Sequence, residues 1–328
     1  MEPLQTVGSP VLWGGFIAFV IAMLALDLGV FHRKAHAVGF KEALGWSTVW
    51  ISLALVFNAG LWWKFGGGPA VEFLTGYLIE KSLSVDNIFV FVVIFSALRI
   101  PALYQHRVLF WGILSALVLR AIMIFAGVAM LERFHWLIYV FGAFLILTGL
   151  KLFFQRNKED HPEDGWMMRM ARKSIPSTPR FDGHHFFTVE NGRKLATPLL
   201  MALILVEASD ILFALDSIPA IFAVTRDPFI VFTSNIFAIL GLRSLFFLLA
   251  GAVEKFSYLK VGLAGVLIFV GTKMAIIDFV KIHPAVSLGV IAGLLGASIV
   301  ASLIKSRHTP PHAPVTSNPE SLAKPSES

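Results

Sequence analysis

Nine apolar stretches, each of about 20 residues, constrain the fold of this 328-residue chain more than any other feature. A helix of that length crosses a bilayer because it satisfies its own backbone hydrogen bonds. The chain is 56% hydrophobic and 15% charged, whereas a soluble domain is about a quarter charged. The sequence therefore predicts an all-α, polytopic transmembrane helix bundle. The predicted spans are 11–31, 46–63, 70–97, 108–128, 135–154, 197–224, 229–250, 259–280 and 284–304.

The distribution of Lys and Arg predicts the orientation of these spans. With the N-terminus outside, 19 basic residues fall in inner segments, 4 in outer loops and 4 within spans. Basic residues favour the cytoplasmic side, so we expect an outer N-terminus and a cytoplasmic C-terminus. No dense basic run with interleaved aromatic residues suggests a nucleic-acid partner. The first ten residues lack a basic n-region, which favours a retained first helix over a cleaved signal peptide.

The residue types present exclude several classes of enzyme and site. The chain has no cysteine, so disulfides, thiolate nucleophiles and cysteine-ligated metal sites are excluded. The His-Glu-x-x-His pattern of zinc proteases is absent. So is the Gly-x-Gly-Asp pattern of intramembrane aspartyl hydrolases. We expect neither an enzyme nor a tightly bound cofactor.

Two of the predicted spans carry acidic residues at depths where a charge is expensive. The stretch 80–87 contains Glu80 and Asp86, and the stretch 207–217 contains Glu207, Asp210 and Asp216. A charge at the bilayer centre costs about 3 kcal/mol on insertion scales. Intramembrane carboxylates usually mark a cation or proton pathway, which is the function that these two stretches predict.

An internal repeat relates the two acidic stretches. Glu80 and Glu207 align without a gap through to Pro101 and Pro228, and later matches follow in order. Each repeat has three spans, so the copies have opposite orientations, a plan common among transporters with a midplane site. The predicted division is 1–64 (spans one and two), 70–154 (repeat one), 155–196 (cytoplasmic loop), 197–280 (repeat two), 284–304 (span nine) and 305–328 (disordered cytoplasmic tail).

Helical spacing groups some of the acidic residues and separates others. Glu80 and Asn87 share one helix face, and so do Glu207 and Asp210. Asp86 and Asp216 do not fit these faces. Either Pro219 breaks the second helix and frees carbonyl ligands, or Asp216 faces a separate vestibule or a basic partner.

The candidate ligands are all oxygen atoms, which suit Mn²⁺, Ca²⁺ or Mg²⁺ better than Zn²⁺ or Cu⁺. Protons can compete with a metal ion for such carboxylates, which makes proton antiport chemically natural. In the alternative reading, basic residues within the spans neutralise the acids in structural salt bridges. The predicted metal ligands are Glu80, Asp86, Asn87, Glu207, Asp210 and Asp216. The predicted counter-charges or gating residues are Lys81, Arg120, Arg243 and Asn235, of which Asn235 could equally form an interhelical hydrogen bond.

Two long motifs resemble those of a known family. They are Glu80-Lys81-Ser82-Leu83-Ser84-Val85-Asp86-Asn87 and the run from Ile204 through Asp216-Ser217-Ile218-Pro219 to Arg243-Ser244. They closely resemble the TerC family, including its Alx branch, over about residues 10–305. The resemblance implies a bacterial inner-membrane protein of about nine spans among the LysE-like cation exporters, with links to manganese export.

The resemblance also carries departures and an alternative function. The stretch from Glu207 to Asp210 is similar to the Glu-x-Gly-Asp motif of related Mn²⁺/Ca²⁺–proton exchangers, with Ser209 in place of glycine and Leu83 at the first repeat's Asp position. We expect Mn²⁺ efflux coupled to protons, with the bilayer, the metal ion and protons as partners. The alternative is an accessory factor for membrane-protein assembly or metal loading. No oligomeric state is predicted.

Overall fold

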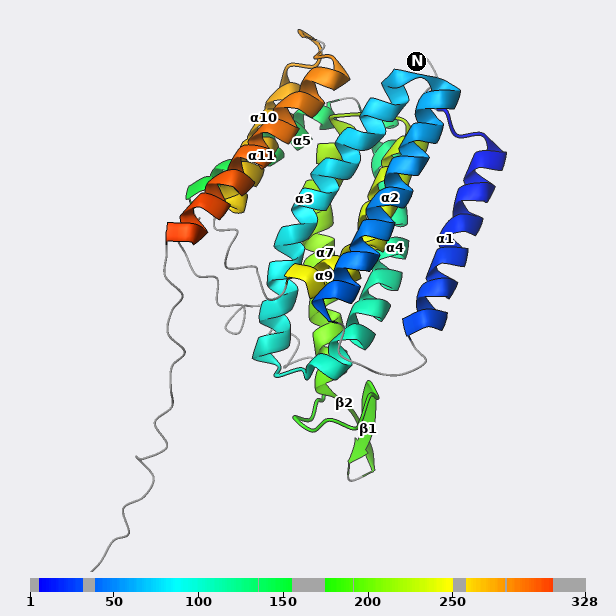
Figure 1. Ribbon diagram of the computed structural model, residues 1–328, viewed down its shortest axis with the longest axis vertical. Coiled ribbons are helices and arrows are strands. Elements are labelled where there is room, and N and C mark those ends of the chain that lie inside the picture. The colour runs from blue at the N-terminus through cyan, green and yellow to red at the C-terminus, as the bar shows by residue number, and fades with distance from the viewer. Residues whose placement is uncertain are drawn as a thin grey trace, which may run out of the picture.

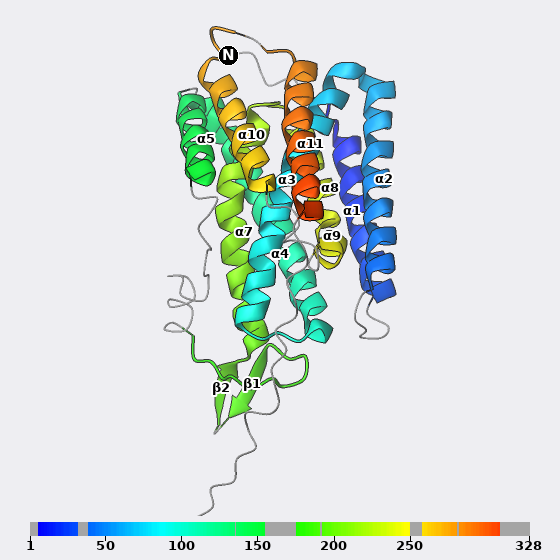
Figure 2. The same cartoon turned by 60° about the vertical axis from the view of Figure 1, so that its left-hand side comes forward.

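The computed structural model describes residues 6–31, 39–134, 136–154, 175–190, 192–249, 258–280 and 282–308, and these residues are mostly helical (Figure 1). The described helices are α1 (Pro10–Phe31), α2 (Phe40–Phe65), α3 (Gly67–Ala97), α4 (Ala102–Arg133), α5 (Leu137–Phe154), α7 (Pro198–Phe222), α8 (Pro228–Leu240), α9 (Leu242–Leu249), α10 (Leu259–Ala275) and α11 (Pro284–His308). The strands are β1 (Phe187–Glu190) and β2 (Arg193–Ala196). They pair as an antiparallel hairpin below α7 (Figure 2).

The described helices account for the predicted spans in different ways. Five of them, α2, α4, α5, α7 and α11, are long and apolar enough to cross a bilayer. The pair α8 and α9 makes a sixth candidate, bent by 42°. The predicted span 229–250 corresponds to this pair, with a break at Gly241 that the sequence did not predict. Helix α3 has 31 residues, enough for about 45 Å, but it carries Glu72, Glu80 and Lys81. The count of nine spans stays a prediction.

Several predicted boundaries also shift. Helix α2 begins at Phe40 instead of residue 46, and α11 continues to His308 instead of ending at residue 304. Residues 305–308 are therefore helical, and the remainder of the predicted tail, 309–328, lies outside the described residues. Of the predicted loop 155–196, residues 155–174 also lie outside them. The part from residue 175 onward carries the β1–β2 hairpin.

The helices that carry the site lie at the centre of the bundle. Helices α3 and α7 pack side by side and run in opposite directions, with α4 against α7 and α8 against α3 (Figures 1 and 2). Helix α5 packs along α10, again antiparallel, and α11 packs against both α10 and α3. Corresponding helices of the two predicted repeats are therefore in contact. That pairing is what an inverted repeat requires, and the repeat itself stays a prediction.

Glycines allow α5 and α10 to touch backbone to backbone. A Cβ atom on Gly142 would lie 2.9 Å from the carbonyl oxygen of Gly271, and one on Gly271 would lie 2.6 Å from that of Gly142. A Cβ atom on Gly149 would lie 2.9 Å from the carbonyl oxygen of Ala264. Small residues at membrane-helix contacts permit this close approach, which gives dispersion contacts and short interhelical distances. We infer that α5 and α10 form one tightly packed pair.

Sequence signals start the helices of the second half. Pro198 opens α7 at a position where its missing N–H costs nothing. Asp227 precedes α8, and its Oδ1 accepts hydrogen bonds from the backbone N–H groups of Phe229 (2.8 Å) and Ile230 (3.4 Å). Its other oxygen, Oδ2, accepts from the N–H of Val7 at 2.7 Å. Asp227 therefore caps α8 and also holds the N-terminal segment that leads into α1.

Candidate functional site

A buried ion cluster joins α3, α4 and α7 at the centre of the bundle. Its members are Glu80 on α3, Arg120 on α4 and Asp210 on α7, whose exposed fractions are 0%, 1% and 4%. Charged side chains are almost never buried to this degree unless they are paired. The structure therefore brings together two of the predicted metal ligands and one predicted counter-charge.

Arg120 connects the two carboxylates through its whole guanidinium group. Its Nη2 donates to Oδ1 of Asp210 at 2.9 Å, and its Nε donates to Oδ2 of the same residue at 3.3 Å. Its Nη1 forms an ion pair with Oε1 of Glu80 and donates to Oγ of Ser217 at 3.2 Å. One guanidinium thus serves two acids, so the trio carries a net charge of about −1 when both acids are ionised. The cluster has the electrostatic capacity for one further positive charge.

Two buried amide oxygens without described donors lie on α8 beside Glu80 and further along α3. Asn235 on α8 donates from Nδ2 to Oε2 of Glu80 at 3.1 Å, whereas its own Oδ1 has no hydrogen-bond partner among the described atoms. Asn87 lies seven residues beyond Glu80 on the same face of α3, and its buried Oδ1 also lacks a described partner. An unsatisfied buried acceptor costs about 1–3 kcal/mol. Oxygens of this kind are available to a cation or to a water molecule.

Glu207 also faces α4, but at another position. Its Oε1 accepts a hydrogen bond of 2.5 Å from Oγ of Ser115, and its buried Oε2 has no described partner. Asp210, one helical turn later, contacts Arg120 instead. The predicted shared face of Glu207 and Asp210 is therefore present, because both turn toward α4. Their polar partners differ, and no sequence signal marked Ser115.

Asp216 occupies a separate place between α7 and α5. Its Oδ1 accepts a hydrogen bond of 3.3 Å from Thr148, and the two residues line a cavity of about 220 Å³ together with Lys151 and Leu83. This arrangement agrees with the second of the two explanations open for Asp216, a separate vestibule with a basic residue nearby.

Helix α7 is not broken at Pro219, and a break occurs in the next helix instead. Pro219 lies in the last turn of α7, which continues to Phe222, so the first of the two explanations open for Asp216 is not seen. The break falls at Gly241, between α8 and α9, where Lys81 donates from Nζ to the carbonyl oxygen of Ala238 at 3.3 Å. That carbonyl is one of the last of α8, which a continuous helix would have satisfied. Lys81 therefore caps the end of α8, and its predicted role as a counter-charge stays a prediction.

The remaining predicted residues complete the picture. Arg243 is buried in α9, with an exposed fraction of 5%. Asp86 lies within α3, but its side chain is outside the described residues. Within the described part of the chain, no group of three His, Cys, Asp or Glu side chains is arranged to hold a metal ion. The described carboxylates of the predicted ligand set are thus divided among the Arg120 cluster, the Ser115–Glu207 contact and the Asp216 cavity.

A second buried polar group lies outside all predictions for the site. Lys273 on α10 is 7% exposed, and its Nζ donates to Oγ of Ser287 on α11 at 3.0 Å. Glu72 on α3 lies close enough to Lys273 and Asp227 for electrostatic interaction. Sequence patterns gave Glu72 no special place, because it lies outside both acidic motifs.

Comparison with known proteins decides the family. Residues 65–310 match the family described as "Integral membrane protein TerC family". The chain belongs to the TerC family. It is therefore a multi-pass integral membrane protein, and the predicted family and all-α membrane bundle are confirmed.

Relatives of this TerC protein cover nearly its full length. It is 86% identical over 310 residues to a Myxococcus xanthus protein named "Uncharacterized membrane protein STKORF319", covering 94% of this chain and 97% of that protein. It is 51% identical over 315 residues to the Escherichia coli (strain K12) protein named "Putative membrane-bound redox modulator Alx", covering 93% and 98%. A Rickettsia bellii protein named "Uncharacterized membrane protein" is 44% identical over 293 residues, covering 89% and 97%. No solved structure matches.

Proposed function

We propose that this TerC protein exports a divalent cation, Mn²⁺ in the first place, from the cytoplasm across the bacterial inner membrane in exchange for protons. The orientation with an outer N-terminus and a cytoplasmic C-terminus is part of this proposal. The observation that carries it is the Arg120 cluster, in which two buried carboxylates share one guanidinium beside acceptor oxygens that lack donors. With one negative charge in excess, such a site can accept a cation. The atoms available to coordinate that cation are all oxygen.

The donor set fits a hard cation. Carboxylate and amide oxygens are the ligands that Mn²⁺, Mg²⁺ and Ca²⁺ prefer. Glu80 and Asp210 supply the carboxylates, and Asn87 and Asn235 supply amide oxygens that have no described donor. Ca²⁺ and Mg²⁺ are the competing substrates.

In the proposed transport, the guanidinium of Arg120 competes with the metal ion for the carboxylates of Glu80 and Asp210. In the described state the guanidinium occupies the carboxylates that the ion would need. Ion binding then requires Arg120 to move away or to share them, and its return favours release. Glu207 and Asp216 serve as further stations, since each is separated from the cluster and has a hydroxyl partner.

The test is Mn²⁺ flux into or out of proteoliposomes with an imposed pH gradient. We expect Asp210→Asn and Glu207→Gln to abolish most of the flux. Asp182→Asn removes an exposed carboxylate outside the helices and should transport like the wild type. Unchanged flux in both the Asp210 and Glu207 variants would exclude this site assignment. Competition by Mg²⁺ and Ca²⁺ in the same assay ranks the three ions.

A second candidate function is that of an accessory factor for membrane-protein assembly or metal loading, in which the acids are purely structural. The same ion cluster favours it, because Arg120 already pairs with both Glu80 and Asp210. This alternative predicts no metal-dependent thermal shift and no flux. It also predicts co-purification of nascent membrane proteins through the 155–196 segment.

The name of the Alx relatives, which includes redox modulation, bears on both candidates. With no cysteine, this chain cannot exchange thiols and disulfides itself. A redox effect of this protein would have to act through the ion that it transports or the partner that it binds.

A further inference from the structure

Helix α1 stands away from its neighbours (Figure 1). Large aromatic side chains connect it to the bundle. Trp13 meets Phe229 edge to face with ring centroids 5.1 Å apart, and Phe16 meets Phe57 at 5.6 Å. Rings of this size hold two helices further apart than the glycines that join α5 to α10. The rings do not fill all of the space between α1 and α2, and a groove remains there.

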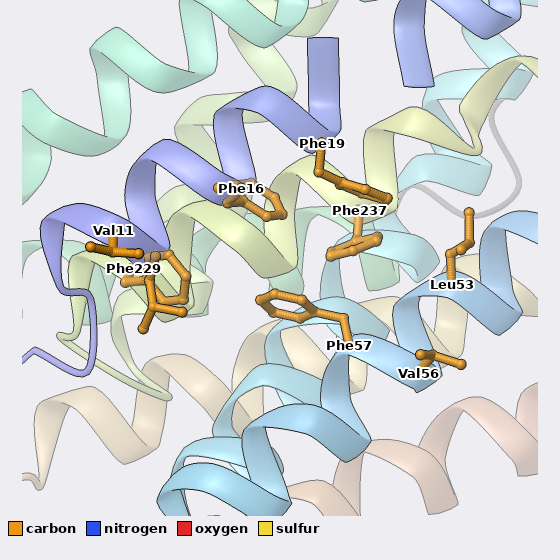
Figure 3. Close-up of a pocket in the computed structure, with 10 residues that line it drawn as sticks. Val11, Phe16, Phe19, Leu53, Val56, Phe57, Phe229 and Phe237 are labelled. Carbon is orange, nitrogen blue, oxygen red and sulfur yellow. The ribbon is translucent and has the colours of Figure 1, made fainter. Parts of the chain in front are cut away.

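The groove has walls from α1 and α2 and a floor from α8 (Figure 3). Its volume is about 350 Å³, and every residue that lines it is apolar, including Val11, Phe16, Val56 and Phe57. Val11 is 83% exposed and Val56 is 69% exposed, so the rim is open to the surroundings. In an integral membrane protein those surroundings are lipid, because the rim lies on the outer surfaces of the helices.

The face of α2 that lines the groove continues to a cation at the end of the helix. Lys64 lies seven residues after Phe57, on the same helix face and about 10 Å further along. Between them, Gly60 leaves the face open, since nothing lies within 4 Å of where its Cβ would be. Trp63, beside Lys64, is 90% exposed. Exposed tryptophan and lysine at a helix end are typical of the headgroup level of a bilayer.

We propose that this groove binds one acyl chain of an anionic phospholipid, whose phosphate contacts Lys64. The apolar lining favours a ligand that has no polar groups where it lies in the groove. Lys64, at the end of the same helix face, favours a negative charge on that ligand. A phospholipid in the leaflet that faces this end of the bundle satisfies both requirements in a single molecule.

The bound lipid gives α1 a second means of attachment. The aromatic side chains hold α1 at one edge of the groove, and the acyl chain fills the remaining gap with apolar contacts that would otherwise be missing. The proposal is independent of transport, because the groove shares no residue with the Arg120 cluster.

Two neighbouring glycines provide a matched pair of variants. Gly15 lines the groove, and nothing lies within 4 Å of where its Cβ would be, so the side chain of Gly15→Leu can extend into the groove. Gly14 is the preceding residue, is equally free of neighbours and does not line the groove. Gly14→Leu is therefore the control. Both variants should unfold at the wild-type temperature.

The experiment is native mass spectrometry of the full chain, mildly delipidated and titrated with phosphatidylglycerol or phosphatidylcholine. We expect one tightly held phosphatidylglycerol per chain in the wild type and in Gly14→Leu. Gly15→Leu should weaken its binding at least tenfold. Lys64→Gln should weaken phosphatidylglycerol about fivefold, the factor for one Lys near a charged surface, and weaken phosphatidylcholine less, because its choline group cancels the charge of its phosphate.

Two results would overturn the proposal. In one, Gly14→Leu and Gly15→Leu bind phosphatidylglycerol as tightly as the wild type. In the other, lipid-free protein forms a two-chain particle that Gly15→Leu converts to single chains, which would show that a second copy covers the groove.

Discussion

Replacing Arg120 by leucine should be among the most destabilising single changes in this protein. The substitution removes three hydrogen bonds to the carboxylates of Glu80 and Asp210, together with the bond to Ser217. Each bond to a charged group contributes about 1.5–3 kcal/mol net, and these bonds are not additive. Breaking a buried ion pair by removing one partner costs about 3–5 kcal/mol. We expect Arg120→Leu to lower the free energy of unfolding by that amount.

The assay is denaturant unfolding in a fixed detergent, followed by helix content and extrapolated linearly to zero denaturant. Arg133→Leu is the matched control, because Arg133 ends the same helix but is exposed. It should change the free energy of unfolding by about 0.5 kcal/mol or less. A loss below about 1 kcal/mol in Arg120→Leu would refute the reasoning, since it would mean that the two carboxylates do not depend on the guanidinium.

A rescue variant separates the two candidate functions. Combining Arg120→Leu with Glu80→Gln and Asp210→Asn removes every charge of the cluster, so most of the lost stability should return. If the acids are purely structural, the function of the protein returns with the stability. If the acids carry an ion, Mn²⁺ flux stays absent in a folded protein. A triple variant as unstable as Arg120→Leu alone would contradict the electrostatic account.

Three further predictions concern other contacts. Gly271→Ala should lower the free energy of unfolding by about 1–3 kcal/mol, because the new Cβ would lie 2.6 Å from the Gly142 carbonyl oxygen. Gly14→Ala is the control, since no atom lies within 4 Å of its Cβ position. Equal unfolding curves for the two variants would contradict this prediction. Asp227→Ala should lower the free energy of unfolding by about 1–2 kcal/mol, because α8 loses its cap. Asp227→Asn should retain most of the stability. If Asp227→Ala is as stable as the wild type, the capping role is contradicted. Asp216→Asn should change the free energy of unfolding by about 0.5 kcal/mol or less. It should nevertheless lose most of the Mn²⁺ flux. Wild-type flux in this variant would show that Asp216 is not part of the transport pathway.

The sequence predicted the helices because apolar length is a local property of the chain. The mid-depth positions expected for Glu80 and Glu207 from helical rise stay predictions. Spacing also placed Glu207 and Asp210 on one face, which the structure supports, since both turn toward α4. The same reasoning recognised Arg120 as a possible counter-charge, without saying which acids it joins.

The partners of each acid could not be predicted, because they come from other helices. Ser115 and Thr148 are ordinary hydroxyl residues in apolar spans, and only packing brings them to Glu207 and Asp216. The position of the helix break also depends on contacts between helices. Pro219 removes one hydrogen bond, to the carbonyl oxygen of Leu215, yet α7 continues to Phe222, whereas the bend at Gly241 is supported by Lys81 from α3.

The glycine contacts between α5 and α10 have a consequence for how this bundle could have arisen. In the predicted repeat, Gly149 corresponds to Gly271, and the same offset relates Gly142 to Ala264. The contact of Gly142 with Gly271 then maps onto the contact of Ala264 with Gly149, as in an isologous dimer. In an ancestral half-length chain that formed a dimer with itself, a single glycine position would have supplied both of these contacts, one from each copy. In the present chain the two positions vary separately, as the alanine at position 264 already shows.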